Sequence, residues 1–100
     1  MGSFGNTGYR PTPGGARVTF NVTTPTLIKG GVGVVYRIYV NTAPTAAGGV
    51  YDSDTSGGAT ASTLIAAIPA TAGILEIVAP CYSGIWVNPG TGGILSVTWE

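Results

Sequence analysis

Two acidic residues and one cysteine are the side chains of this sequence whose types and spacing could do chemistry. Asp52 and Asp54 lie in the run Asp52–Gly57, which matches the opening D-x-D-x-S-G of a calcium-binding loop. The twelfth position of such a loop should hold a bidentate Glu, but this sequence has Thr63 there. The run is instead typical of a turn in which short polar side chains bond back to the chain. We therefore expect neither a metal ion nor a cofactor at this position.

The residue types present leave few routes to catalysis. The 100-residue chain contains no His, so neither a Ser-His-Asp nor a Cys-His arrangement can be built. Asp52 and Asp54 would lie roughly 7 Å apart on one face of an extended segment, but no other acidic residue is near them in sequence. Cys81, the single cysteine, has no basic residue close in sequence and is expected to be a small buried or half-buried hydrophobic residue. The sequence predicts a protein that is not an enzyme.

The composition bears on the partners of the protein. Charged residues make up 8% of the chain, four basic and four acidic, against roughly 25% in an average soluble chain. A net charge of zero gives no general attraction to nucleic acid or to an acidic membrane. No apolar run approaches the roughly 18 residues of a membrane span. So few charges make a poor surface for a soluble monomer, and we expect much of the surface to be covered by partner proteins.

The first 15 residues form a separate segment. They are rich in Gly and Pro and lack a periodic pattern, which predicts an extended arm instead of a helix or a central strand. The large side chains of the arm besides Met1 are Phe4, Tyr9 and Arg10, and we expect these three to anchor it on its own domain or on a neighbouring subunit. The alternative of a flexible tail stays open. A single β-sandwich domain is expected over residues 16–100, because the length fits one domain.

From Ala16 onward the dominant pattern is an alternation of apolar and polar residues, which indicates strands. The run 73–79 has apolar residues on both faces, which suggests a strand covered on both sides. Apolar runs at 27–28, 50–51, 82–87 and 94–99 complete the expected strands. The alternation predicts two apolar faces, one of Val18, Phe20 and Val22 and one of Val34, Tyr36, Ile38 and Val40.

Turn signals separate these runs at short intervals. Asn88-Pro89-Gly90 is a strong one, because Pro presets φ and Gly tolerates a positive φ. One short crossover helix is expected over Ala59–Ile68, where apolar residues recur at helical spacing until Pro69 ends the run. Together the pattern predicts an all-β fold, a single small antiparallel β-sandwich or jelly roll with an extended N-terminal arm, and a small barrel is the alternative.

The sequence contains more large aromatic residues than one small core can comfortably enclose. Because aromatic residues are enriched at interfaces, we expect some of them to face a partner, with Tyr39 and Trp86 as the candidates. The alternative is that all are ordinary core or half-exposed residues. The aromatic residues considered are Tyr36, Tyr39, Tyr82, Trp86 and Trp99.

The C-terminal two thirds of the chain carry a set of short motifs. Val50-Tyr51-Asp52 ends one strand, Ile68-Pro69 makes a corner, Pro80 leads through Gly84-Ile85 into a further strand, and Gly92-Gly93 opens the last one. Over about residues 32–100 this set resembles the small structural proteins of tailed bacteriophages, β-sandwiches that decorate or cement capsids. The resemblance implies a structural role in the virion and carries over no catalytic residues.

We therefore expect a capsid decoration or cement protein that stabilises a bacteriophage capsid through subunit-bridging contacts. Its partners would be the major capsid protein and neighbouring copies of itself, with no nucleic acid and no membrane. Its location would be the virion, assembled in the cytoplasm of the bacterial host. The alternative is a phage tail or fibre component or a carbohydrate-binding β-module, for which exposed aromatic residues on a β-face would be the distinguishing feature.

Overall fold

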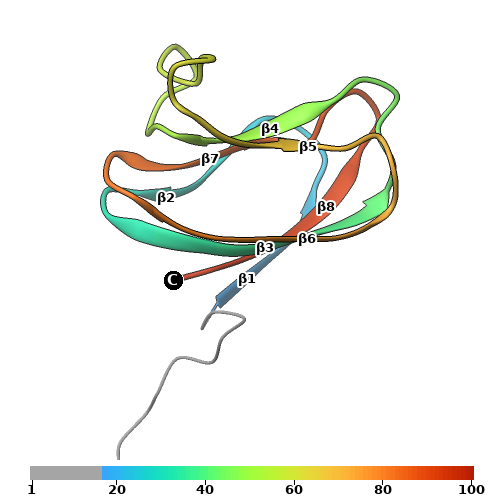
Figure 1. The fold of residues 1–100 in the computed structure, drawn as a ribbon, viewed down its shortest axis with the longest axis horizontal. Helices are drawn as coiled ribbons and strands as arrows, with labels where there is room; N and C mark the ends of the chain where they lie inside the picture. Colours follow the sequence, from blue (N-terminus) through green and yellow to red (C-terminus); the bar gives the residue numbers. More distant parts are fainter. Residues whose placement is uncertain (1–16) are drawn as a thin grey trace, which may run out of the picture.

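The computed structural model describes residues 17–100, which form two antiparallel four-stranded sheets packed face to face (Figure 1). The expected small antiparallel β-sandwich is confirmed. The first sheet, here called sheet I, has the strand order β1 (Arg17–Val22), β8 (Ile94–Trp99), β3 (Gly33–Thr42) and β6 (Gly73–Cys81). The second, sheet II, has the order β2 (Thr26–Gly30), β7 (Gly84–Asn88), β4 (Gly48–Asp52) and β5 (Leu64–Ile68).

The strand pairing follows one simple rule. Strand β1 pairs with β8, β2 with β7, β3 with β6 and β4 with β5, all antiparallel. This is the pairing of one long hairpin that has been rolled up so that its strands are shared between two sheets. The strand order is therefore that of an eight-stranded jelly roll, an architecture found in viral capsid and lectin domains.

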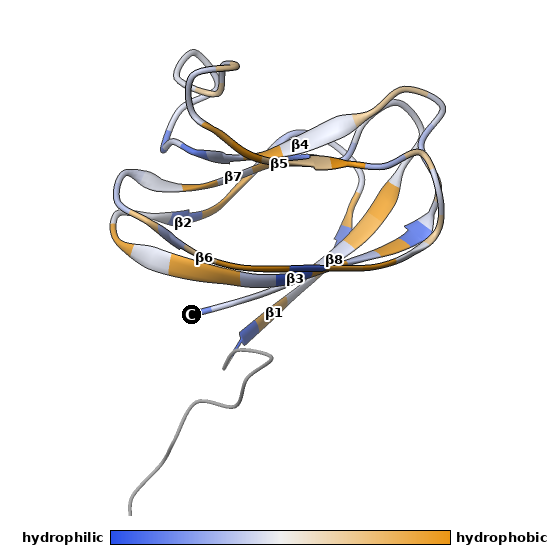
Figure 2. Ribbon diagram, in the orientation of Figure 1, coloured by the Kyte–Doolittle hydropathy of each residue, from blue (hydrophilic) through white to orange (hydrophobic). Residues whose placement is uncertain are grey.

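The core lies between the two sheets and is almost entirely aliphatic. Figure 2 shows hydrophobic stretches along β6, β8 and β3. The burial of the side chains shows that inward and outward residues alternate along much of these strands. Each fully buried aliphatic side chain contributes about 1.5–3 kcal/mol, so this layer is the main source of stability. The buried hydrophobic residues are Val22, Val35, Ile38, Val40, Val50, Ile68, Cys81, Ile85, Val87, Leu95 and Val97.

A β-bulge in β1 corrects one of the predicted faces. The register against β8 shifts between Thr19 and Val22, and Asn21 has a φ of 57°. An extra residue in a strand moves every later side chain to the other face. Val22 is consequently buried, whereas Phe20 points outward and is 71% exposed. The prediction that Val18, Phe20 and Val22 share one face is therefore wrong.

A second irregularity lies in β3, where the register against both neighbours shifts between Val35 and Arg37. Val35 is buried before the shift, and the burial resumes at Ile38 after it. The strict alternation expected for this strand fails for the same reason as in β1. Of the predicted face, Ile38 and Val40 lie in the core, whereas Val34 and Tyr36 are only partly buried.

Strand β6 is an edge strand of sheet I, and the prediction that both of its faces are covered is wrong because Ile74 and Val78 are exposed on its outer face. Leu75 and Ile77 pack against the core, but Ile74 is 67% exposed on the opposite face. Pro80 fits an edge strand, because proline has no N–H to give to a further neighbour. Val78 has a φ of 50°, a conformation that β-branched residues rarely adopt.

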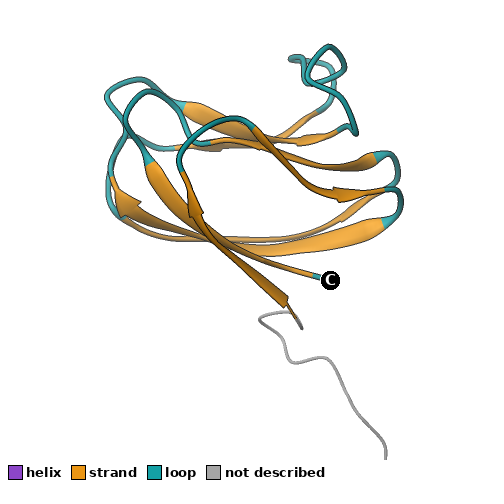
Figure 3. Cartoon of the chain, turned by 180° about the vertical axis from the view of Figure 1, so that it is seen from behind, coloured by secondary structure: helices purple, strands orange, loops and turns teal. Residues whose placement is uncertain are grey.

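Residues 17–100 contain no helix (Figure 3), so the helix expected over Ala59–Ile68 is wrong. The chain instead turns as far as Thr63 and then enters β5. The Thr63 hydroxyl donates to the carbonyl of Gly58 at 2.6 Å, which fixes the turn. Side-chain bonds of this kind and the pairing of β5 with β4 override a weak helical spacing.

Candidate functional site

The two predicted aromatic candidates lie on opposite outer faces of the sandwich. Tyr39 lies in β3 and lines a groove on the outer face of sheet I. Trp86 lies in β7 between Ile85 and Val87, which are fully buried, so its side chain is on the outer face of sheet II. The two residues therefore belong to two separate surfaces. The predicted arm anchors Phe4, Tyr9 and Arg10 lie outside the described residues.

Four large side chains form a row across the outer face of sheet II, here called the sheet II stripe. Trp86 is paired with Leu27 on one side and with Tyr51 on the other, and Tyr51 is paired with Leu64. Side chains directly opposite each other on neighbouring strands lie about 5 Å apart. Leu27 and Leu64 are 41% and 43% exposed, so the stripe is accessible to water at both ends, and Trp86 and Tyr51 between them are half-buried.

Tyr51 lies flat on sheet II because Gly49 makes room for it. A Cβ atom built on Gly49 would lie 2.8 Å from the Tyr51 hydroxyl and 2.9 Å from its ring and from Leu64. The Tyr51 side chain thus lies close over the backbone of Gly49, and Trp86 is its cross-strand neighbour. The two residues form an adjacent aromatic pair on the outer face of sheet II.

The outer face of sheet I has a different shape. The central strand β8 carries the small side chains of Ser96 and Thr98 outward, and larger side chains on β1 and β3 stand on both sides of them. The result is a groove of about 340 Å³ along β8. Its lining residues are Val18, Phe20, Tyr39, Asn41, Ser96 and Thr98. We call this feature the sheet I groove.

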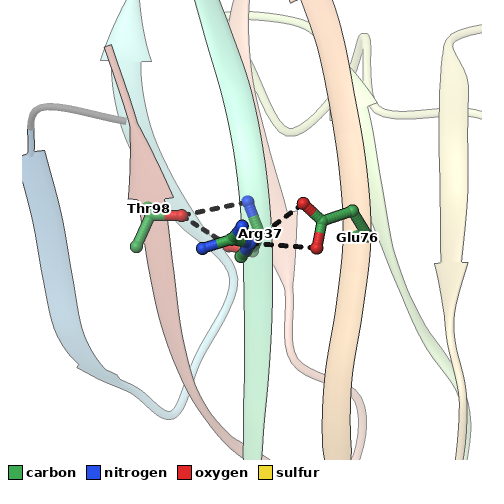
Figure 4. Close-up of polar contacts among 3 residues, drawn as sticks. All are labelled: Arg37, Glu76 and Thr98. Atoms are coloured by element: carbon green, nitrogen blue, oxygen red, sulfur yellow. Dashed lines mark hydrogen bonds and ion pairs between the residues drawn. The ribbon is translucent and has the colours of Figure 1, made fainter. Parts of the chain in front are cut away.

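Polar groups on the sheet I face are bonded to one another. Arg37 Nε donates to both carboxylate oxygens of Glu76 at 2.9 Å, across the pair β3–β6 (Figure 4). The Thr98 hydroxyl accepts from the backbone N–H of Arg37 at 3.0 Å, which satisfies this donor at the β3 irregularity. At the groove floor, Asn41 Nδ2 donates to the nearly buried Ser96 hydroxyl at 3.2 Å. The face is therefore polar in places but carries little unbalanced charge.

One end of the sandwich presents two apolar tips. Val32, in the β2–β3 turn, is 69% exposed, and Tyr82, in the β6–β7 turn, is 71% exposed. The two turns are adjacent, since Gly31 N–H donates to the carbonyl of Ser83 at 2.9 Å. Both tips belong to turns that connect one sheet to the other.

Asp52 fixes the turn that carries Tyr82. Its Oδ1 accepts from the backbone N–H groups of Tyr82 at 2.9 Å, Ser83 at 2.8 Å and Gly84 at 3.4 Å. Partial burial raises the pKa of Asp52, but these N–H groups together outweigh that effect, and the net pKa lies below the ordinary 3.8. The Asp52 carboxylate thus stabilises a turn.

The segment that resembles a calcium loop is a hydrogen-bonded turn, as expected. The Ser53 hydroxyl donates to the carbonyl of Thr55 at 2.7 Å and accepts from its N–H at 3.1 Å. Thr63, at the position where a calcium loop needs Glu, bonds to the turn itself. Within residues 17–100, no three side chains of His, Cys, Asp or Glu come together as a metal site would require.

Cys81 is buried, as expected, and has no disulfide partner in the sequence. Burial and, to a smaller extent, the nearby Asp52 carboxylate together raise the pKa of its thiol to about 11. The thiol is therefore protonated at neutral pH and is a weak nucleophile. Its place in the core accounts for a small, apolar side chain at this position.

Sequence reasoning missed most of the sheet II stripe. Leu27, Tyr51 and Leu64 are far apart in the chain and become neighbours only through strand pairing. The available signal was local: Gly49 stands two residues before Tyr51, which places both on one face of a strand. A glycine in a strand often marks a place where another group approaches the backbone closely.

Comparisons of the chain with family models, with curated proteins and with solved structures give no match. The part of the chain that the structure describes contains no helix that could cross a membrane. The fold itself defines the class: a small antiparallel β-sandwich with jelly-roll strand order. Its distinguishing features are a stripe, a groove and a pair of apolar tips.

Proposed function

We propose that this protein is a structural component of a virion, attached to the surface of a bacteriophage capsid, which it reinforces by bridging neighbouring subunits. The observation that carries the proposal is the number of large apolar side chains exposed on both outer faces and on one end. Exposed apolar patches mark interaction sites, and a surface with so few charges is poorly suited to isolation in water. The exposed large hydrophobic residues are Val18, Phe20, Leu27, Val32, Leu64, Ile74, Val78 and Tyr82.

Two further points support this role. The jelly roll is an architecture that viral capsid domains use, although a fold alone does not determine a function. The apolar side chains also lie on more than one side of the molecule, which suits a protein wedged between subunits. A standard interface buries about 800 Å² on each partner, and several weaker contacts in each copy add up through avidity. The mechanism is therefore area burial without chemistry.

The proposed partners are the major capsid protein and neighbouring copies of this chain. In this mechanism residues 1–15 are an arm that reaches a neighbour through Phe4, Tyr9 and Arg10. The rigid turn around Tyr82 is a second anchor, because a preorganised aromatic side chain loses little conformational freedom on binding. The protein acts in the virion after assembly in the bacterial host cytoplasm.

The test uses the full chain and a chain of residues 17–100, which holds every core residue named above. Each is mixed with phage heads that lack the protein, both before and after expansion. We expect the full chain to bind stoichiometrically and to raise the temperature at which heads rupture. We expect the shorter chain to fold, judged by circular dichroism, and to bind less. Equal occupancy by the two chains would remove the arm from the proposal, and absence of binding by both would overturn the capsid role.

A second candidate function is carbohydrate binding in a tail, a fibre or a similar module. It is favoured by one specific observation, the adjacent aromatic pair of Trp86 and Tyr51 on the outer face of sheet II, since lectin domains share this architecture. The apolar face of a sugar ring can stack on aromatic side chains. The variant Trp86→Ala should abolish retention on a glycan array if this function is correct. A wild-type protein that retains no glycan would contradict it.

A further inference from the structure

The outer face of sheet I has a ridge beside its groove. The ridge consists of Val18 and Phe20 on the edge strand β1, which are 44% and 71% exposed. The groove runs along the neighbouring strand β8, over Ser96 and Thr98. Because the ridge and the groove follow adjacent antiparallel strands, they run side by side in the same direction across the face.

We propose that this face is a self-association surface, on which two copies pack sheet I against sheet I about a two-fold axis. A ridge next to a parallel groove is self-complementary, because a two-fold rotation places the ridge of each copy in the groove of the other. Phe20 of one copy then lies over Ser96 of the second, against the ring of Tyr39. Aromatic side chains that fill a partner's groove contribute most of the binding energy in such contacts.

The charges on the face are compatible with its burial. Arg37 and Glu76 already form an ion pair within one copy, with both carboxylate oxygens at 2.9 Å from Arg37 Nε. Covering an ion pair carries a desolvation cost, but the cost is larger for a charge that loses its partner, and here neither charge does. The Asn41 amide and the Ser96 hydroxyl are likewise bonded to each other. Two such faces neither repel each other nor leave an unpaired charge between them.

The free edge of β6 is less suited to contact between copies. Pro80 offers no N–H, Glu76 carries a charge, and the backbone is distorted at Val78 with a φ of 50°. Charges, proline and bulges on an edge strand all oppose the addition of another strand. These features oppose association of two copies through the edge of β6.

The available area indicates a weak dimer. Four strands about 4.8 Å apart and about six residues long at ~3.3 Å each cover roughly 400 Å² in projection. Even with side-chain relief, this is near the lower limit of specific interfaces, which bury about 600 Å² or more per partner. The contact therefore operates at high local concentration, as in an assembled lattice. It deepens the proposed contact between neighbouring copies, but it is tested in solution without capsids, so the two proposals can fail separately.

The experiment is sedimentation equilibrium of the full chain from about 10 μM to about 1 mM, concentrations that cover weak binding. We expect a concentration-dependent dimer whose dissociation constant rises at least tenfold, about 1.4 kcal/mol, in Phe20→Asp and in Val18→Asp. The matched control is Leu64→Asp, because Leu64 lies on sheet II and is 43% exposed against 44% for Val18. The control should dimerise like wild type. Circular dichroism verifies that all variants are folded.

Three results would overturn the proposal. The first is a wild-type chain that stays monomeric at the highest concentration. The second is a dimer that resists Phe20→Asp and Val18→Asp but is lost in Leu64→Asp, which would place the contact on sheet II. The third is a protein that stays monomeric and binds a small ligand in the sheet I groove. Amide shifts of Ser96 and Thr98 that change on dilution would independently support the sheet I contact.

Discussion

The Asp52 carboxylate offers the sharpest test of the structure, since one side chain holds the backbone of a whole turn. The substitution Asp52→Ala removes the acceptor for the N–H groups of Tyr82, Ser83 and Gly84. The substitution Asp52→Asn keeps an acceptor oxygen of the same shape but removes its charge. Comparing the two variants separates the effect of the hydrogen bonds from the effect of the charge.

The expected magnitude follows from the geometry. The bonds from Tyr82 and Ser83 are 2.9 and 2.8 Å long, whereas the third, at 3.4 Å, is too long to count fully. A hydrogen bond to a charged group contributes about 1.5–3 kcal/mol, and water reaches this turn. We therefore expect Asp52→Ala to lower the free energy of unfolding by about 2 kcal/mol and Asp52→Asn by about 1 kcal/mol. For a chain of this size, 2 kcal/mol corresponds to a fall in Tm of about 8–16 °C.

The pH dependence gives a second, independent signature. The pKa of Asp52 lies below its ordinary value of 3.8 in the folded protein, so ionisation of this group favours folding. That contribution is fully present above the ordinary pKa and is lost as the pH falls through the lower folded value. Urea unfolding of wild type and Asp52→Asn should give a constant difference from neutral pH to about pH 4, and a shrinking one below it. A difference that stays constant down to about pH 2 would refute this account.

The remaining predictions concern Val78, Cys81 and two glycines. Val78→Gly removes a backbone strain of about 1–3 kcal/mol that arises from the positive φ of this exposed residue. Urea unfolding should show a higher free energy of unfolding, although glycine loses more conformational entropy on folding than valine. A lower free energy of unfolding would contradict the strain. The Cys81 thiol, with a pKa of about 11, should react with a thiol reagent at neutral pH only after denaturant is added, and fast labelling of the native protein would show it accessible. Gly48→Ala should cost about 3 kcal/mol, because its Cβ would collide with the backbone oxygen of Asn88. Gly49→Ala should cost under about 1 kcal/mol, since only the movable ends of side chains are in the way, and equal losses for both variants would count against this geometry.

The fold class was predictable because strand signals are local. Residues 95–99 alternate between apolar and polar side chains after the turn signal Gly92-Gly93, and β8 spans the expected range, Ile94–Trp99. The outward side chain of Phe20 was not predictable, because the bulge at Asn21 depends on how β1 fits against β8. The helix prediction for residues 59–68 was wrong for a related reason. The spacing of the apolar residues there is compatible with a helix, and only the pairing of β5 with β4 makes part of the segment a strand.

The candidate surfaces were predictable only in part. Tyr39 and Trp86 are on outer faces, but sequence alone could not place them on opposite sides of the molecule. Their neighbours depend on register, which is set by pairing between strands far apart in the chain. Phe20 and Tyr51 therefore emerge as surface features from the fold, although each is an ordinary strand residue in the sequence.

The position of β8 in sheet I has a consequence for the synthesis of the protein. It is the eighth strand in chain order, yet it lies between β1 and β3 and supplies the fully buried Leu95 and Val97 to the core. Until the ribosome has made these residues, β1 and β3 have no common neighbour and sheet I cannot close. The native sandwich therefore forms only after β8 has been synthesised, and a nascent chain that stops before Ile94 lacks the strand that joins β1 to β3.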